Sequence, residues 1–129
     1  MATIKRFEDI QAWQKARELV GEVYKACAKG PLQRDFGLKD QLCRAAVSAM
    51  SNIAEGFARK TDRDFAHFLD VAKGSAVETQ SLLYAALDIG HITTDEFRRL
   101  HGLAEETASL IGGFAAYLRK TQGVPGVAK

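Results

Sequence analysis

Proline, cysteine and long apolar runs are scarce in this sequence, and each shortage excludes a class of protein. Only two of the 129 residues are proline, which suits the chain to long helices. Cys27 and Cys43 are too few for a disulfide framework or a zinc site, so we expect free, buried thiols. No apolar run reaches the roughly eighteen residues of a membrane-spanning helix, and the N-terminal residues show no secretion signal. We therefore expect a cytoplasmic protein with no membrane contact.

Excess charge of one sign is also missing, since 18 Lys and Arg residues stand against 16 Asp and Glu residues. A balance this even does not by itself indicate nucleic-acid binding. The charges are distributed less evenly along the chain. Residues 1–60 carry 11 basic and 7 acidic residues, whereas residues 61–90 carry 2 basic and 5 acidic residues. This asymmetry permits a basic patch on one part of the molecule.

Apolar residues recur at steps of three and four in four stretches, which predicts four amphipathic helices. We place these helices at about 7–29, 37–59, 62–89 and 94–120. The connections are short, and Gly30-Pro31 and Gly90 are typical helix stops. The pattern predicts an all-α protein of one domain, residues 1–121, folded as an antiparallel up-and-down four-helix bundle. A flexible tail is expected at 122–129, where no periodicity remains.

The stretch 37–60 carries two helical stripes. Large and small apolar residues from Leu38 to Phe57 form the first, which must face the core. The second mixes one cation, one anion and three small polar residues: Arg44, Ser48, Ser51, Asn52 and Glu55. An ordinary solvated face carries Lys, Glu and Gln instead, so this line predicts close approach by another helix. The mid-helix Gly74 predicts a second close approach.

Arg44, Asn52, Glu55 and Glu78 require partners if they are buried, because an unpaired interior charge costs several kcal/mol. We expect them to satisfy one another. With Ser48, they then fix the register of the bundle or of a subunit contact. The alternative, which the sequence leaves open, is that they form partly exposed ion pairs.

Residues that could carry catalysis or bind a metal are sparse. The three histidines, His67, His91 and His101, do not stand at metal-ligand spacing from another His, Cys or carboxylate pair. No Gly-rich phosphate loop is present, and the helical serines have no histidine in obvious reach. We expect no catalytic residue, no bound metal and no cofactor, and therefore no enzyme.

Arg59, Lys60 and Arg63 cluster between the second and third predicted helices. Cations at the end of a bundle can bind phosphates through charge and counterion release, which makes these three residues the candidate nucleic-acid site. The alternative is a solvated helix terminus, where basic residues are common.

Several segments together resemble the four-helix-bundle proteins encoded in intervening sequences of bacterial 23S ribosomal RNA genes, the S23 family. The most specific are Asp40-Gln41-Leu42 with Arg44-Ala45-Ala46-Val47-Ser48, Ser51-Asn52-Ile53-Ala54-Glu55-Gly56-Phe57 with Arg59, and Ala72-Lys73-Gly74-Ser75 with Glu78. The resemblance extends from about Phe7 to Leu118. It implies a four-helix bundle that forms a ring-like homopentamer and binds RNA or other nucleic acid.

These observations predict a non-enzymatic, oligomeric helical bundle with a nucleic-acid-associated or scaffolding role. The alternative is an adaptor that binds a partner protein and has no nucleic-acid role. Salt-dependent binding to structured RNA separates the two hypotheses.

Overall fold

The structure, a computed structural model, describes residues 4–122. Two short 3₁₀ helices and four long α-helices make up this part of the chain. In order, they are η1 (Phe7–Asp9), α1 (Gln11–Cys27), η2 (Pro31–Arg34), α2 (Phe36–Phe57), α3 (Asp62–Asp88) and α4 (Thr94–Gln122).

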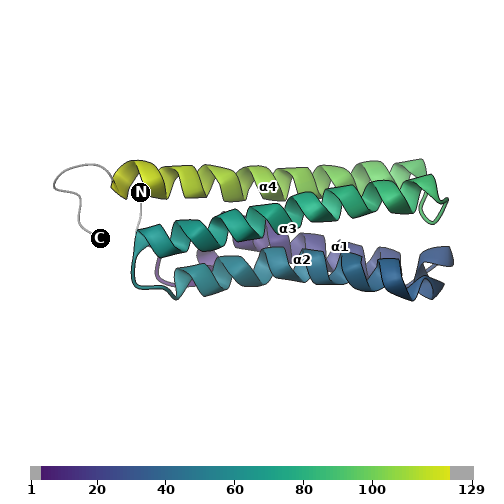
Figure 1. The fold of residues 1–129 in the computed structure, drawn as a ribbon, viewed down its shortest axis with the longest axis horizontal. Helices are drawn as coiled ribbons and strands as arrows, with labels where there is room; N and C mark the ends of the chain where they lie inside the picture. Colours follow the sequence, from purple (N-terminus) through teal and green to yellow (C-terminus); the bar gives the residue numbers. More distant parts are fainter. Residues whose placement is uncertain (1–3, 123–129) are drawn as a thin grey trace.

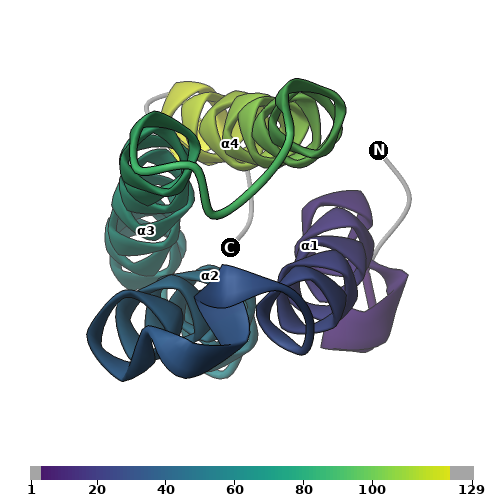
Figure 2. The ribbon, with the colours of Figure 1, turned by 90° about the vertical axis from the view of Figure 1, so that its right-hand side faces the viewer.

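The four α-helices run antiparallel to their neighbours in sequence and lie side by side (Figure 1). Viewed along the bundle, α1 and α3 occupy opposite corners of a square, as do α2 and α4 (Figure 2). Each helix packs against the next in the chain, and α4 closes the bundle by packing against α1. The predicted all-α, up-and-down four-helix bundle is therefore confirmed.

Two predicted boundaries at the N-terminal side differ from the structure. The first helix was expected from residue 7, but η1 ends at Asp9 and Ile10 is extended before α1 begins at Gln11. The connection at residues 30–36, predicted only to be short, contains η2. Leu32 in η2 and Ile10, the extended residue between η1 and α1, are buried apolar residues of the core. The C-terminal tail predicted at 122–129 lies outside the described residues apart from Gln122, which ends α4.

Side-chain caps mark the starts of α2, α3 and α4. Asp35 accepts a hydrogen bond from the Leu38 amide at the start of α2, and Thr61 does the same for Asp64 at the start of α3. Before α4, the Thr93 hydroxyl accepts from the Glu96 amide while Glu96 accepts from the Thr93 amide. This reciprocal capping box satisfies two helix-terminal donors at once.

The core consists of two clusters of large apolar side chains separated by a layer of alanine. One cluster lies towards the α2–α3 turn and includes Trp13, Ile53 and Ile111. The other lies towards the α3–α4 turn and includes Leu19, Leu42 and Leu100. Between them, one alanine from each of α2, α3 and α4 forms the layer: Ala49, Ala76 and Ala108. Small side chains at this level allow the helices to approach closely.

Gly56, not Gly74, marks the close approach of two helices within the chain. A Cβ atom on Gly56 would lie 2.8 Å from both Phe65 Cδ1 and Phe68 Cβ. A Cβ atom on Gly74 would meet nothing within 4 Å. The expectation of a close contact at Gly74 is therefore wrong for the single chain, because this residue lies on the outer side of α3.

The two glycines give a matched pair of stability predictions. We expect Gly56→Ala to lower the free energy of unfolding by about 1–3 kcal/mol, because α3 must shift away from α2. Gly74→Ala, at an open helical position, should be neutral or stabilising by up to about 1 kcal/mol. Urea unfolding of both variants measures the difference, and equal effects would contradict the observed packing.

Candidate functional site

One end of the bundle gathers basic residues from three separate parts of the chain. Arg59, Lys60 and Arg63 lie at the α2–α3 turn. The start of α1 and the end of α4 lie at the same end (Figure 1) and carry two further basic pairs. These pairs are Lys5 with Arg6 and Arg119 with Lys120. The fold therefore extends the sequence-predicted cluster with residues that are distant along the chain. We call these seven residues the basic end.

The cations of the basic end differ in how they are engaged. Arg59 lies over the Phe68 ring, 4.5 Å from its centroid, which holds the guanidinium at the surface. Arg6 forms ion pairs with acids of η1 at 3.5 and 3.7 Å. Within residues 4–122, Lys5, Lys60 and Lys120 are exposed and form no ion pair. These three ammonium groups can bind an external anion without first breaking an internal pair.

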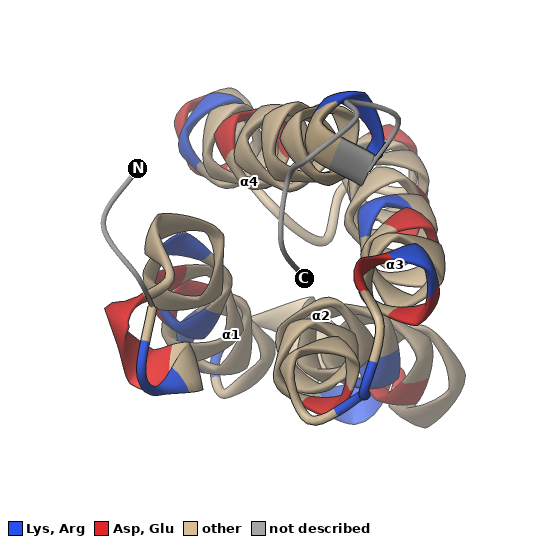
Figure 3. Cartoon of the chain, turned by 90° about the vertical axis from the view of Figure 1, so that its left-hand side faces the viewer, with Lys and Arg blue, Asp and Glu red and all other residues tan. Residues whose placement is uncertain are grey.

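Arg119 takes part in a structural contact instead. Its Nη1 donates to Asp70 Oδ1 at 3.0 Å, which ties α4 to α3. The Arg119 guanidinium lowers the pKa of the Asp70 carboxyl below its usual value. Acidic residues also occur at this end, so basic and acidic segments alternate over its surface (Figure 3). The basic end is thus a set of exposed cations among acids and not a uniformly positive face.

Part of the polar line predicted on α2 forms a hydrogen-bonded contact with α3. The Ser48 and Ser75 hydroxyls lie 2.8 Å apart, and Asn52 Nδ2 donates to Ser48 Oγ at 3.0 Å. Ser75 in turn donates to the Val71 carbonyl at 3.2 Å. This short chain of bonds satisfies small polar groups where α2 and α3 approach.

The charged members of that line do not join this network, and the expectation that they satisfy one another is wrong. Arg44 is exposed and pairs with Asp40 on its own helix, Nε to Oδ2 at 2.8 Å. Glu55 and Glu78 are also exposed. All three lie on the sides of α2 and α3 that face away from the bundle axis. The alternative of an exposed ion pair holds for Arg44.

These residues define an outer face shared by α2 and α3. It consists of small or charged exposed residues: Arg44, Ser51 and Glu55 from α2, and Val71, Gly74 and Glu78 from α3. We call it the α2–α3 face. Residues with short or no side chains at the centre of this face would allow another helix to pack closely.

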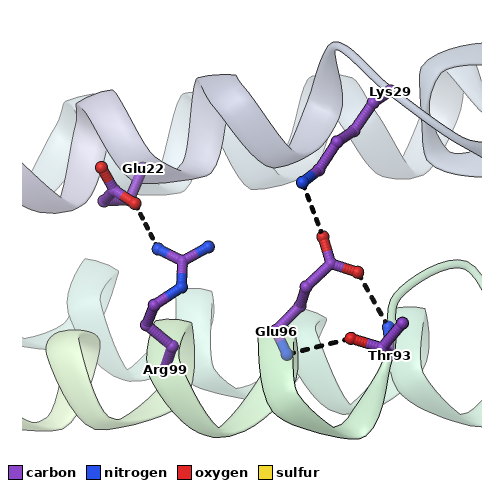
Figure 4. A network of polar contacts seen from close by, with 5 residues as sticks. All are labelled: Glu22, Lys29, Thr93, Glu96 and Arg99. Carbon is purple, nitrogen blue, oxygen red and sulfur yellow. Dashed lines mark hydrogen bonds and ion pairs between the residues drawn. The ribbon is translucent and has the colours of Figure 1, made fainter.

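The opposite seam, between α1 and α4, is closed by ion pairs. Lys15 and Glu22 on α1, and Lys29 just after its last residue, are spaced by seven residues. They pair with Glu106, Arg99 and Glu96 on α4, respectively. Two of these pairs appear in Figure 4, together with the Thr93–Glu96 capping box. The signs of the charges alternate along the seam and match in only one register of the two helices. The ion pairs therefore favour this alignment of α1 with α4.

Asp35 and His91 connect the two loops at the other end of the bundle. His91 Nε2 lies 3.0 Å from Asp35 Oδ2, so the α3–α4 turn is held against the start of α2. The Leu38 amide and, next, His91 lower the pKa of the Asp35 carboxyl. This contact has a structural role in joining the two turns.

Three polar residues, Ser75, Thr79 and Thr107, are buried on the inner sides of α3 and α4. Thr79 donates to the Ser75 carbonyl at 2.9 Å and Thr107 to the Leu103 carbonyl at 2.8 Å. These hydroxyls complete their bonds within their own helices, so they tolerate burial without a ligand. Their position on the apolar stripe is the feature of the sequence that indicates their burial.

The described part of the chain offers no cluster of three or more His, Cys, Asp or Glu side chains suited to a metal ion. His67, the histidine nearest to two acids in sequence, is exposed, and its neighbour Asp70 binds Arg119. Within residues 4–122, no helix combines the length and apolar character that crossing a membrane requires.

The geometry defines a class of protein: an all-α, antiparallel four-helix bundle with an exposed basic end. The model of the 23S rRNA-intervening sequence protein family matches residues 8–113. The chain therefore belongs to this family.

Comparison with solved structures agrees on the fold. The crystal structure of a protein with unknown function from the S23 ribosomal protein family of Bacteroides thetaiotaomicron is similar, with a TM-score of 0.74 and 22% sequence identity. The match covers 81% of this chain and 97% of that protein. A search among curated proteins gives no match.

The Glu96 carboxylate gives a testable pH dependence. The Thr93 amide, then Lys29, lowers its pKa in the folded state below the ordinary value of 4.5. The carboxylate therefore contributes stability above pH 4.5, and this contribution is lost as the pH falls through the lower, folded-state pKa. We expect the melting temperature of the parent chain to fall between pH 6 and roughly pH 3, and that of Glu96→Gln to fall by less over the same range.

The exposed Glu105→Gln serves as the matched control. It should reproduce the parent profile, because Glu105 takes no part in the seam between α1 and α4. An identical profile for Glu96→Gln and Glu105→Gln would contradict the role assigned to Glu96.

Proposed function

We propose that this protein is a non-enzymatic, self-associating helical bundle whose basic end binds the phosphate backbone of structured RNA or other nucleic acid. The observation that supports nucleic-acid binding most is the convergence of exposed cations from three separate segments at one end. Arg59, Lys60 and Arg63 form its centre, and Lys5 and Lys120 extend it.

Binding of this kind depends on charge and salt more than on base sequence. Each Lys or Arg that neutralises a phosphate releases a counterion, so affinity falls steeply as salt rises. The Phe68 ring, beside the central cations of the basic end, is covered by Arg59 and offers no open face for base stacking. A folded RNA with closely spaced phosphates therefore suits this end better than an unstructured single strand.

Self-association multiplies the weak attraction of a single basic end. One chain presents only a few unpaired cations, but several copies in a ring present them together and bind with greater avidity. The α2–α3 face supports such an assembly because it combines small residues with both signs of charge. Arg44 of one copy can pair with Glu55 or Glu78 of another without an excess of charge at the contact.

The RNA-binding prediction is tested by charge reversal. The variant R59E/K60E/R63E should bind a structured RNA at least about tenfold more weakly than the parent chain at low salt, because three phosphate contacts are replaced by repulsion. Fluorescence anisotropy over a range of salt concentrations measures both the affinity and its salt slope, and the slope should become shallower by about 2–3.

A control with the same charge change lies at the opposite end of the bundle. K25E/R34E/R98E alters three exposed cations near the α1–α2 and α3–α4 connections. It should retain most of the binding. Equal loss in both variants would indicate a general charge effect and would contradict a site at the basic end.

The self-association prediction is tested on the α2–α3 face. Ser51→Arg places a long charged side chain at the centre of this face and should shift the sedimentation coefficient towards that of a monomer. Ser109→Arg makes the same change on the exposed side of α4 and should leave the assembly intact. Circular dichroism should remain helical for both variants, since exposed substitutions usually cost under about 0.5 kcal/mol.

A second candidate function, a protein-binding adaptor without a nucleic-acid role, is favoured by a different surface. Tyr24, Phe36 and Val47 are exposed along the α1–α2 side, and Phe36 is 72% accessible. Exposed apolar residues gathered on one side suit a protein partner. Recovery of one defined partner after nuclease treatment, with no RNA binding by the purified chain, would favour this candidate.

A further inference from the structure

The two cysteines, separate in sequence, meet where α1 and α2 lie side by side. Cys27 is the last residue of α1, and Cys43 lies in the second turn of α2. The connection through η2 brings the start of α2 back along the end of α1. Both side chains pack against the same apolar cluster, which includes Leu42. The fold therefore places two free thiols in one neighbourhood.

Solvent reaches the two thiols unequally. Both line a surface pocket of about 850 Å³, together with Tyr24, Phe36 and Lys39. Cys43 is half-buried, whereas Cys27 is only 3% exposed. A small oxidant that enters the pocket therefore encounters Cys43 first.

The electrostatic environment separates the two thiols further. Burial and, next, the neighbouring Cys43 thiol raise the pKa of Cys27 to about 12. Cys27 is therefore protonated at neutral pH and is a poor first nucleophile, because the thiolate is the reactive form.

We propose that Cys43 and Cys27 form a reversible dithiol–disulfide pair, in which Cys43 reacts first with a hydroperoxide and Cys27 resolves the product. In the first step, the Cys43 sulfur attacks one peroxide oxygen, the O–O bond breaks, and sulfenic acid and water or an alcohol result. In the second step, the Cys27 sulfur attacks the sulfenic sulfur, water leaves, and the S–S bond forms. The peroxide is reduced by two electrons and the two thiols are oxidised by two.

The disulfide would join the end of α1 to the second turn of α2 across the η2 connection. It would also fix one wall of the pocket that contains Tyr24 and Phe36, which are the exposed aromatic residues of this side. The surface of the α1–α2 side would thus respond to oxidation while the basic end, at the other end of the bundle, stays unchanged. This proposal does not depend on nucleic-acid binding.

The test uses the full chain, hydrogen peroxide and three measurements. After treatment and removal of peroxide, we expect both thiols to be lost in a thiol assay under denaturing conditions. The intact mass should fall by that of two hydrogens, and the chain should remain uncrosslinked to other copies on a non-reducing gel. Dithiothreitol should restore both thiols.

Two variants separate the roles of the cysteines. In Cys27→Ala, Cys43 should accumulate as sulfenic acid, which dimedone traps. In Cys43→Ser, the Cys27 thiol should survive the same treatment. Helical circular dichroism of each variant shows that it is folded before oxidation, and Cys27→Ser serves in place of Cys27→Ala if the latter unfolds.

Three results would overturn the proposal. They are survival of both thiols in the parent chain, a disulfide between two chains instead of within one, and oxidation of Cys43 to sulfinic acid with Cys27 left as a thiol. Loss of the Cys27 thiol in Cys43→Ser at the parental rate would also contradict the assigned order.

Discussion

Close packing of α2 against α3 through small residues is the constraint on which the rest of the bundle depends. Ala49 and Ala76 lie in the alanine layer, and the Ser48 and Ser75 hydroxyls bond directly at 2.8 Å. Gly56 then allows the end of α2 to touch the backbone of α3. Because these contacts leave no room for larger side chains, the large apolar residues gather in two clusters on either side of the alanine layer. The core thus has small side chains at its middle and larger ones towards both ends of the bundle.

This arrangement also determines which surfaces remain for function. The buried sides of α2 and α3 use the small residues and the alanine stripe, so the charged residues Arg44, Glu55 and Glu78 are left outside. The seam between α1 and α4 is occupied by its own ion pairs (Figure 4). The exposed surfaces include the α2–α3 face, the basic end and the pocket beside α1 and α2. The proposed roles in assembly, nucleic-acid binding and oxidation fall on these three surfaces.

The sequence allowed the four helices and their antiparallel order to be predicted, because a stripe at steps of three and four is a local property. The stop at Gly30 was predicted for the same reason, and this glycine has a positive φ of 64°.

The direction of each polar line was not predictable. Whether Arg44 points into the bundle or away from it depends on how α2 is rotated against α3 and not on its spacing. The close helix contact was predicted at Gly74 but lies at Gly56 for the same reason, since a glycine in a helix does not reveal which neighbour it meets. The gathering of Lys5 and Lys120 beside Arg59 likewise depends on tertiary packing.

We propose that the α2–α3 face joins copies of this chain into an assembly that presents several basic ends together. The most direct measurement is the solution mass of the parent chain by multi-angle light scattering, with a chain mass of 14.1 kDa as the unit. If the α2–α3 face forms this contact, we expect a discrete oligomer of five copies that keeps its mass over a range of dilution. A mass of one chain at every concentration would contradict the assembly and with it the avidity on which the proposed RNA binding depends.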